Sequence, residues 1–328
     1  MSRGAVTGAK GGALVGRPTV ESNHDELALL PLSDVEGATG ASANLLSDLA
    51  TLLKLRVNIL VLLTSAVGYV LALPSGVAAD FEALAHGLLG TFILAASASA
   101  MNQVRERELD RAMPRTADRP LAAGRRSPRK VAVLAIGASI LGFFYLALAS
   151  GWLPATLGLV TFVVYAFAYT PLKRRSPLAL HVGAISGALP PVIGWTIAGE
   201  GIGAGAWVLF ALLFFWQIPH FHAIAWLYRD DYRAGGFRML AVVRPDGRLL
   251  AFEAVVMTLV VVAVSLLPAM IDSLSSAYLV FASGIGLAFV ASALVFAWSR
   301  SVRSARVLMA ASLIYLPLVL LAWVASTP

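Results

Sequence analysis

Nine apolar segments, each roughly 20 residues long, limit this chain to one class of structure. A helix needs about 20 predominantly apolar residues to cross a bilayer. Only 13% of the residues are charged, against about 25% in soluble domains. We therefore predict an all-α integral membrane protein with nine transmembrane helices around a central cavity. The predicted spans are approximately 57–75, 84–104, 131–150, 152–170, 178–198, 206–228, 251–271, 276–298 and 306–325.

The positions of Lys and Arg predict the orientation of these helices. All 25 fall in the N-terminal segment or in alternate gaps between spans, at residues 105–130, 173–175, 229–248 and 300–306. The intervening gaps carry only acidic charges. Because positively charged loops stay in the cytoplasm, we predict a bacterial inner-membrane protein with a cytoplasmic N-terminus and an external C-terminus. Topology explains the basic charge, so no nucleic acid is expected as a partner.

The N-terminal residues 1–45 differ in composition from the rest. They are rich in Gly, Ala and Ser, with scattered charges and no long apolar core. This composition predicts a disordered cytoplasmic tail without a cleavable signal peptide, followed by a nine-helix domain at 46–328. The chain has no cysteine, which excludes disulfides and cysteine-ligated metal sites.

A charged segment follows the second span, at 102–121 (NQVRERELDRAMPRTADRPL). Asn102, Glu106 and Asp110 are four residues apart, so they share one face of a helix. Two carboxylates and an amide on one face suit a hard cation that also carries a phosphate. A simpler alternative is that the charges anchor a helix end at the lipid headgroups. Acids at this spacing repel each other without a cation, which favours the metal site.

A second segment, WQIPHFHAIAWLYRDDYRAGGFRML at 216–240, repeats this arrangement after the sixth span. Asp230 and Asp231 stand at its helix end and are followed by arginines and a turn. Equivalent positions four helices apart indicate an internal repeat in which both loops face one cavity. Adjacent residues point to different sides of a helix, so only one of the two aspartates is expected to face that cavity.

Several segments, in order, resemble the UbiA superfamily of intramembrane prenyltransferases. They are the two charged segments, TLLKLRVNILVLLTSAVGYVLA (51–72) and YTPLKRRSPLALHVGAISGALPPVIGW (169–195). The resemblance extends over residues 50–325. Glu106 departs from the family pattern, which has aspartate there, although glutamate is still a hard oxygen ligand. The second motif has His220 and His222 near its first acidic position, which favours heme over a hydroxybenzoate as the acceptor.

The resemblance implies a Mg²⁺-dependent transfer of a farnesyl group from farnesyl diphosphate to the vinyl group of heme b, within the lipid bilayer. The implied metal ligands and catalytic residues are Asn102, Glu106, Asp110, Asp230 and Asp231. The implied diphosphate ligands are Arg115, Arg119, Lys173, Arg174, Lys54 and Arg56. The implied heme ligands are His220 and His222; His220 is favoured if only one binds iron, and His181 is a less favoured partner. The activity also implies heme A synthase or a terminal oxidase assembly as a protein partner.

Three other interpretations stay open at the level of sequence. A relative that prenylates an aromatic acid or quinone precursor shares the Mg²⁺ chemistry but has no need of His220. An ion-coupled transporter also carries polar residues on broken helices. A non-catalytic membrane scaffold predicts that residues 102–119 tolerate substitution freely.

Overall fold

The computed structural model describes residues 45–272 and 274–327, whose regular elements are all helices. The tail predicted at 1–45 lies outside these ranges, apart from its last residue. Within them, nine helical spans are long and apolar enough to cross a membrane, which confirms the predicted number. The spans are α2 (Leu55–Ala72), α3 (Phe81–Arg111), α4 (Pro128–Ser150), α5–η1–α6 (Trp152–Val163, Val164–Tyr169, Thr170–Leu172), α7 (Ala179–Ile197), α8 (Ala204–Leu227), α11–α12 (Arg248–Leu266, Pro268–Ile271), α13 (Ser276–Ser299) and α14 (Val302–Ser326).

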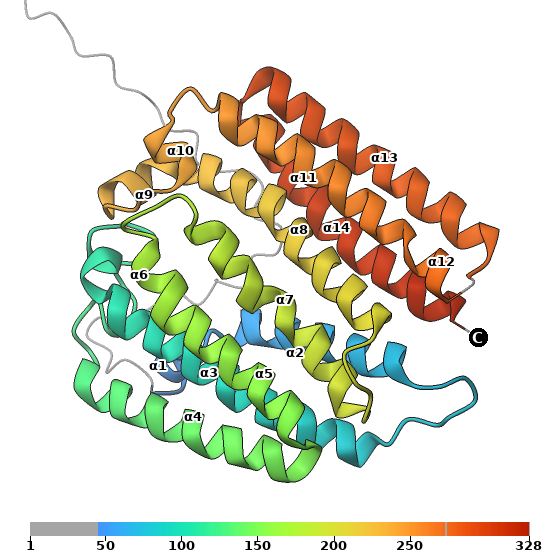
Figure 1. The fold of residues 1–328 in the computed structure, drawn as a ribbon. Helices are drawn as coiled ribbons and strands as arrows, with labels where there is room; N and C mark the ends of the chain where they lie inside the picture. Colours follow the sequence, from blue (N-terminus) through green and yellow to red (C-terminus); the bar gives the residue numbers. More distant parts are fainter. Residues whose placement is uncertain (1–44, 273, 328) are drawn as a thin grey trace, which may run out of the picture. The chain divides into compact units, whose positions relative to one another are not determined.

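Three short helices lie outside the spans: α1 (Leu45–Leu52) precedes the first span, and α9 (Arg229–Ala234) and α10 (Leu240–Val243) lie between α8 and α11. Figure 1 shows α9 and α10 near the start of α11, at the same end of the helices as α6. The second charged segment is therefore not one continuous helix. It breaks after Leu227, and Asp230 and Asp231 lie on α9 instead of on the end of α8.

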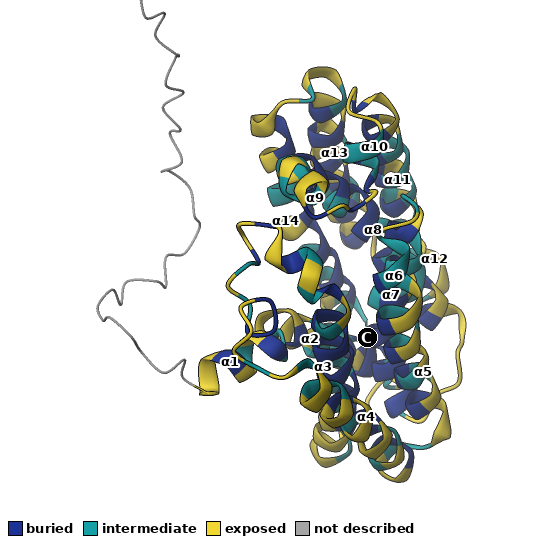
Figure 2. Ribbon diagram, turned by 90° about the vertical axis from the view of Figure 1, so that its left-hand side faces the viewer, coloured by how far each residue is buried: buried dark blue, intermediate teal, exposed yellow. Residues whose placement is uncertain are grey.

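The helices α7 and α8 lie at the middle of the helical packing. α7 packs against α2, α5 and α8, and α8 packs in turn against α11 and α14 (Figure 1). α4 and α13 have outward faces that carry exposed apolar residues such as Leu148 and Trp298 (Figure 2). Exposed apolar surface of this kind suits contact with lipid chains, as expected for spanning helices.

Two glycines bring α2 and α7 into backbone contact. A Cβ at Gly68 would overlap the carbonyl oxygen of Pro191, and a Cβ at Gly194 would overlap that of Ser65. Small residues allow helices to approach this closely, so that van der Waals contacts replace the missing hydrophobic force between helices in a membrane. The contact fixes α2, and with it Lys54 at its N-terminal end, against α7.

The helix α3 is the longest in the described ranges and carries the predicted metal ligands in its last turns. Asp80 caps its start by accepting hydrogen bonds from the backbone N–H groups of Glu82 and Ala83, both at 3.0 Å. The helix continues past the predicted span end at residue 104 to Arg111, shortly before Pro114. Proline disfavours the helical conformation in the residue that precedes it, which accounts for the end of α3 shortly before Pro114.

Candidate active site

The three predicted ligands on α3 lie on one buried face, as their spacing predicts. Asn102 is 0% exposed, Glu106 4% and Asp110 1%. Glu108, which points to another side of the helix, has a side chain that is 61% exposed. We call Asn102, Glu106 and Asp110 the α3 ladder. Buried polar groups of this kind require partners, and each of the three has one from a different segment.

Lys54 and Thr170 hold the first residue of the α3 ladder. Lys54 Nζ donates to Asn102 Oδ1 at 2.6 Å and to the Tyr165 hydroxyl at 3.1 Å. Asn102 Nδ2 donates to Thr170 Oγ1 at 2.9 Å. Lys54 has a φ of 46°, in the left-handed region that residues with a Cβ rarely adopt. The turn between α1 and α2 thus directs a lysine into the site.

Lys173 is the partner of the second residue. Its Nζ lies 2.8 Å from Glu106 Oε1, and the two side chains are only 14% and 5% exposed. The same ammonium lies 4.3 Å from the centre of the Tyr169 ring, a cation–π contact. Burial by itself lowers the pKa of Lys173, but the Glu106 carboxylate outweighs it and the pKa lies above its ordinary value. Lys173 is therefore positively charged.

Arg119 is the partner of the third residue. Its Nη1 donates to both carboxylate oxygens of Asp110, at 2.8 and 2.9 Å. The segment after α3 folds back on the helix end, because Thr116 Oγ1 donates to the backbone carbonyl of Asp110 at 2.9 Å. The α3 ladder is thus matched by three cations, Lys54, Lys173 and Arg119, from three separate segments.

The two charged segments meet, as predicted. Arg115 Nε lies 3.8 Å from Asp231 Oδ2, and the Arg238 backbone N–H donates to the Lys173 carbonyl at 2.8 Å. Segments far apart in the sequence therefore share one end of the helices. We call residues 102–127, 170–178 and 228–247 the polar end.

The two adjacent aspartates of α9 have different environments. Asp231 faces the first charged segment through Arg115, and its side chain is 26% exposed. Asp230 is 76% exposed and pairs with Arg233 on the same short helix at 2.6 Å. As expected for neighbouring residues, only Asp231 is turned toward the other charged segment.

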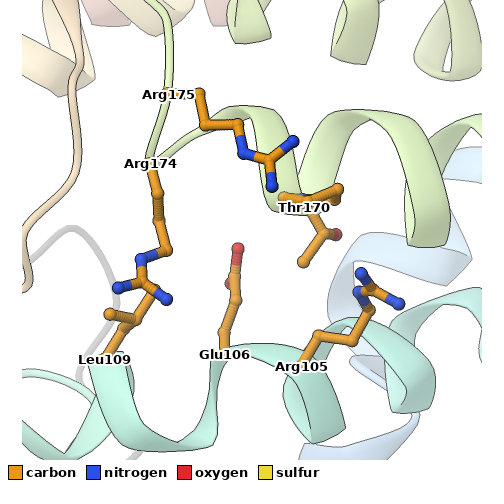
Figure 3. A pocket seen from close by; sticks show the side chains of 7 residues that line it. Arg105, Glu106, Leu109, Thr170, Arg174 and Arg175 are labelled. Atoms are coloured by element: carbon orange, nitrogen blue, oxygen red, sulfur yellow. The ribbon is translucent and has the colours of Figure 1, made fainter.

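A cavity of about 500 Å³ opens beside Glu106. Figure 3 shows Arg105, Arg174 and Arg175 arranged around the Glu106 carboxylate, from α3 and from the segment after α6. Of these arginines, only Arg174 was predicted as a diphosphate ligand from the sequence, although the basic run 173–175 was a signal for Arg175 as well. Such a group of guanidinium ions suits a phosphate ligand. Arg56, by contrast, is exposed and pairs with none of the acids in the described ranges.

Comparison with known proteins decides the family. A sequence profile of the UbiA prenyltransferase family matches residues 61–324. The chain belongs to this family. The protoheme IX farnesyltransferase of Solibacter usitatus is 40% identical over 279 residues, which are 83% of this chain and 96% of that protein. The UbiA membership and the nine apolar spans together make the chain a multi-pass membrane protein.

Solved UbiA-family structures share the fold. The structure of a digeranylgeranylglyceryl phosphate synthase matches 86% of this chain and 98% of its own, with a TM-score of 0.73 and 16% identity. A UbiA homolog from Archaeoglobus fulgidus, bound to GPP and Mg²⁺, matches 84% of this chain and 99% of its own, with a TM-score of 0.57 and 16% identity. At these identities the comparison establishes the helical architecture alone.

The oxygen donors of this UbiA-family site fit a Mg²⁺ ion that arrives with its substrate. Glu106 Oε1 is buried and, although Lys173 is close, forms no hydrogen bond of good geometry within the described residues. The described ranges hold no group of three or more His, Asp or Glu side chains already arranged around a metal position. Mg²⁺ characteristically takes one or two carboxylates plus substrate phosphates in place of an all-protein cage. The α3 ladder and Asp231 supply such a partial set.

The two histidines of α8 face different helices, although the sequence analysis grouped them. His220 Nδ1 lies 2.8 Å from Ser312 Oγ of α14, and its ring stacks on Trp216 with 4.9 Å between the ring centres. His222 Nε2 instead lies 3.0 Å from Glu253 Oε2 of α11. Two residues along a helix differ by about 200° in direction, which accounts for the separation.

Glu253 is a polar residue that the sequence analysis missed. Its Oε1 lies 2.6 Å from Nε2 of His181, the histidine that was the less favoured candidate. Its carboxylate therefore contacts an imidazole from each of two helices, α7 and α8. The available signal was that Glu253 is the only charged residue in the apolar stretch 249–271, where an ionisable group calls for a partner.

Proposed function

We propose that this UbiA-family protein transfers the farnesyl group of farnesyl diphosphate to a vinyl group of heme b, giving heme O and diphosphate. The observation that carries the proposal is the 40% identity to a protoheme IX farnesyltransferase over 96% of that protein. The buried α3 ladder and its cations support it, because a metal-bound diphosphate needs hard oxygen ligands together with Arg and Lys donors.

The donor half of the reaction takes place at the polar end. Bound Mg²⁺ supplies Lewis acidity and charge neutralisation to a diphosphate that leaves an allylic carbon. Asn102, Glu106 and Asp110 hold the metal, and Asp231 approaches from α9. Asp230, exposed and paired with Arg233, lies on the outer side of α9 and is not assigned to the metal.

The basic residues that contact the α3 ladder or Asp231, or that line the cavity beside Glu106, are the ones placed to bind diphosphate: Lys54, Arg115, Arg119, Lys173 and Arg174. Three of these side chains now pair with acids: Lys173 with Glu106, Arg119 with Asp110 and Arg115 with Asp231. When Mg²⁺ and diphosphate bind together, the acids gain a cation and the bases gain an anion, so no buried charge is left without a partner. Arg56 is exposed and stays outside this group.

The transfer breaks the C–O bond between the farnesyl carbon and diphosphate and forms a C–C bond to the heme vinyl group. Water then supplies the hydroxyl group of the product with loss of one proton. Apolar helices around the farnesyl chain limit earlier attack of water on the allylic cation. For the acceptor, His220 is oriented through Nδ1 by Ser312, which leaves Nε2 for heme iron in the manner of ligating histidines.

The charge pattern supports an orientation with the polar end in the cytoplasm, the N-terminus cytoplasmic and the C-terminus external. We place the protein in a bacterial inner membrane. Heme A synthase or a terminal oxidase assembly is the partner that would receive the product.

The test is synthesis of heme O by the purified protein in nanodiscs supplied with heme b, farnesyl diphosphate and Mg²⁺, analysed by chromatography of the pigments. Glu106→Gln should lower the rate at least about tenfold, a loss of about 1.4 kcal/mol of transition-state stabilisation, and EDTA should abolish turnover. Glu108→Gln, a charge removal on an exposed face of the same helix, is the matched control and should leave the rate unchanged. If the wild type made no heme O and prenylated 4-hydroxybenzoate instead, the acceptor would have to be reassigned. A fully active Glu106→Gln variant would contradict the metal site.

A further inference from the structure

A second cavity, also of about 500 Å³, lies between α7, α8, α10 and α11 and takes no part in the donor site. Its polar lining consists of His181, His222, Glu253 and Arg244, and the remaining side chains are almost all apolar. We call it the histidine groove. Its volume falls within the range of about 300–1,000 Å³ that is usual for small-molecule sites.

Glu253 contacts both imidazoles of the histidine groove, but it does not satisfy all of their ring nitrogens. His222 is 2% exposed, and its Nε2 forms no hydrogen bond of good geometry in the described ranges, although Glu253 lies 3.0 Å away. His181 donates toward Glu253 on one side of its ring, while its buried Nδ1 has no hydrogen-bond partner there. A buried polar atom without a partner costs free energy, so Nδ1 of His181 indicates a ligand.

The chemistry of the lining favours an iron porphyrin as that ligand. Imidazole is a common axial ligand of heme iron, and a carboxylate that holds the other ring nitrogen is the usual support of a ligating histidine. Arg244 matches a propionate, and apolar residues such as Met257 suit the macrocycle. A bare metal ion fits less well, because the described residues contain no group of three ligands arranged for one.

The location suits a ligand that arrives from the bilayer and continues to the donor site. Leu249 and Phe252 line the groove and are 50% and 66% exposed on the outer face of α11. The segment 173–178 borders both cavities, since Arg174 and Arg175 line the one beside Glu106 and Pro177 and Leu178 line the histidine groove. A single short segment therefore separates the two sites.

We propose that the histidine groove is a second heme site, in which an imidazole of His181 or His222, supported by Glu253, binds heme b taken from the bilayer before it reaches the acceptor position near His220. This inference rests on the proposed function, because it takes heme b to be the acceptor. It assigns to Glu253 the role of a positioning residue and to Arg244 the recognition of a propionate.

The experiment is titration of the purified full chain, in phosphatidylcholine nanodiscs, with ferric heme b while the Soret band is recorded. His181→Ala/His222→Ala should raise the Kd at least about tenfold and remove the histidine-ligated component of the spectrum, and free imidazole should restore that component. His220→Ala should retain it. The matched control is His86→Ala, which removes a histidine that is hydrogen-bonded to Tyr145 of α4 and does not line the groove. This variant should leave the titration unchanged.

Arg244→Gln provides a second test in case the double variant fails to fold. Arg244 is exposed, so its replacement should leave folding intact. It should weaken binding of heme b but not of heme b dimethyl ester, which lacks the carboxylates. The groove assignment would be overturned if the double variant kept the wild-type Kd and spectrum. It would also be overturned if Arg244→Gln weakened the binding of both hemes equally. Heme O synthesis by the wild type is scored separately, so a protein that makes heme O but ignores these substitutions refutes the groove alone.

Discussion

Replacing Lys173 with Met should destabilise the protein more than replacing Lys173 and Glu106 together. The single substitution leaves the Glu106 carboxylate buried, at 5% side-chain exposure, without its cation. The double substitution Lys173→Met/Glu106→Gln removes both charges. A buried ion pair gives little net stability, because desolvation offsets its attraction, but a buried charge without a partner is costly.

The magnitude follows from the geometry. At the observed 2.8 Å separation, an effective dielectric constant of about 20 gives a gross attraction of about 6 kcal/mol. Most of it offsets the desolvation of the two charges. We therefore expect Lys173→Met to lower the free energy of unfolding by about 3–5 kcal/mol, and the pair to show a coupling energy of about 2–3 kcal/mol in a double-mutant cycle.

The assay is unfolding in mixed micelles by increasing SDS, followed by tryptophan fluorescence, for the wild type, both single variants and the double variant. A second cycle on Glu108 and Arg111 is the control, because that pair lies on the same helix at 3.0 Å but is 61% and 55% exposed. It should give a coupling of less than about 1 kcal/mol. Additive effects of Lys173→Met and Glu106→Gln, or equal coupling in both cycles, would refute the reasoning.

Two further predictions concern packing and pH. Gly194→Ala should cost about 1–3 kcal/mol of unfolding free energy, because its Cβ would overlap the Ser65 carbonyl, while Gly284→Ala, which meets open space, should be neutral in the same SDS assay. Burial raises the pKa of Asp48, but hydrogen bonds from Arg126 and Arg125 outweigh burial and hold the pKa below its ordinary value. The stabilisation from the Asp48 carboxylate is therefore present above about pH 4 and is lost as the pH falls through the folded-state pKa. The thermal unfolding temperature of Asp48→Asn, measured against pH, should lack this part of the acid dependence. The same pH profile in Asp48→Asn and in the wild type would contradict the prediction.

Much of the architecture follows from local sequence patterns. The nine spans are recognisable because a helix that crosses a bilayer needs a fixed length of apolar residues, and the structure places helices at all nine positions. The α3 ladder is recognisable because a spacing of four residues fixes a common helix face. Burial of Asn102, Glu106 and Asp110 confirms that face. These features depend only on the length and periodicity of single segments.

The partners of those residues were decided by the tertiary structure. Nothing local assigns Lys173 to Glu106, turns Asp231 inward in preference to Asp230, or separates His220 from His222. Spanning helices are apolar on the sides that face lipid and on the sides that face protein, so their pattern does not reveal which side meets which neighbour. Glu253 shows the same limit, because its contacts with the histidines of α7 and α8 depend on how α11 is rotated against those helices. The sequence by itself determined the helices and the chemistry at their ends, and the packing of those helices determined which charges and imidazoles meet.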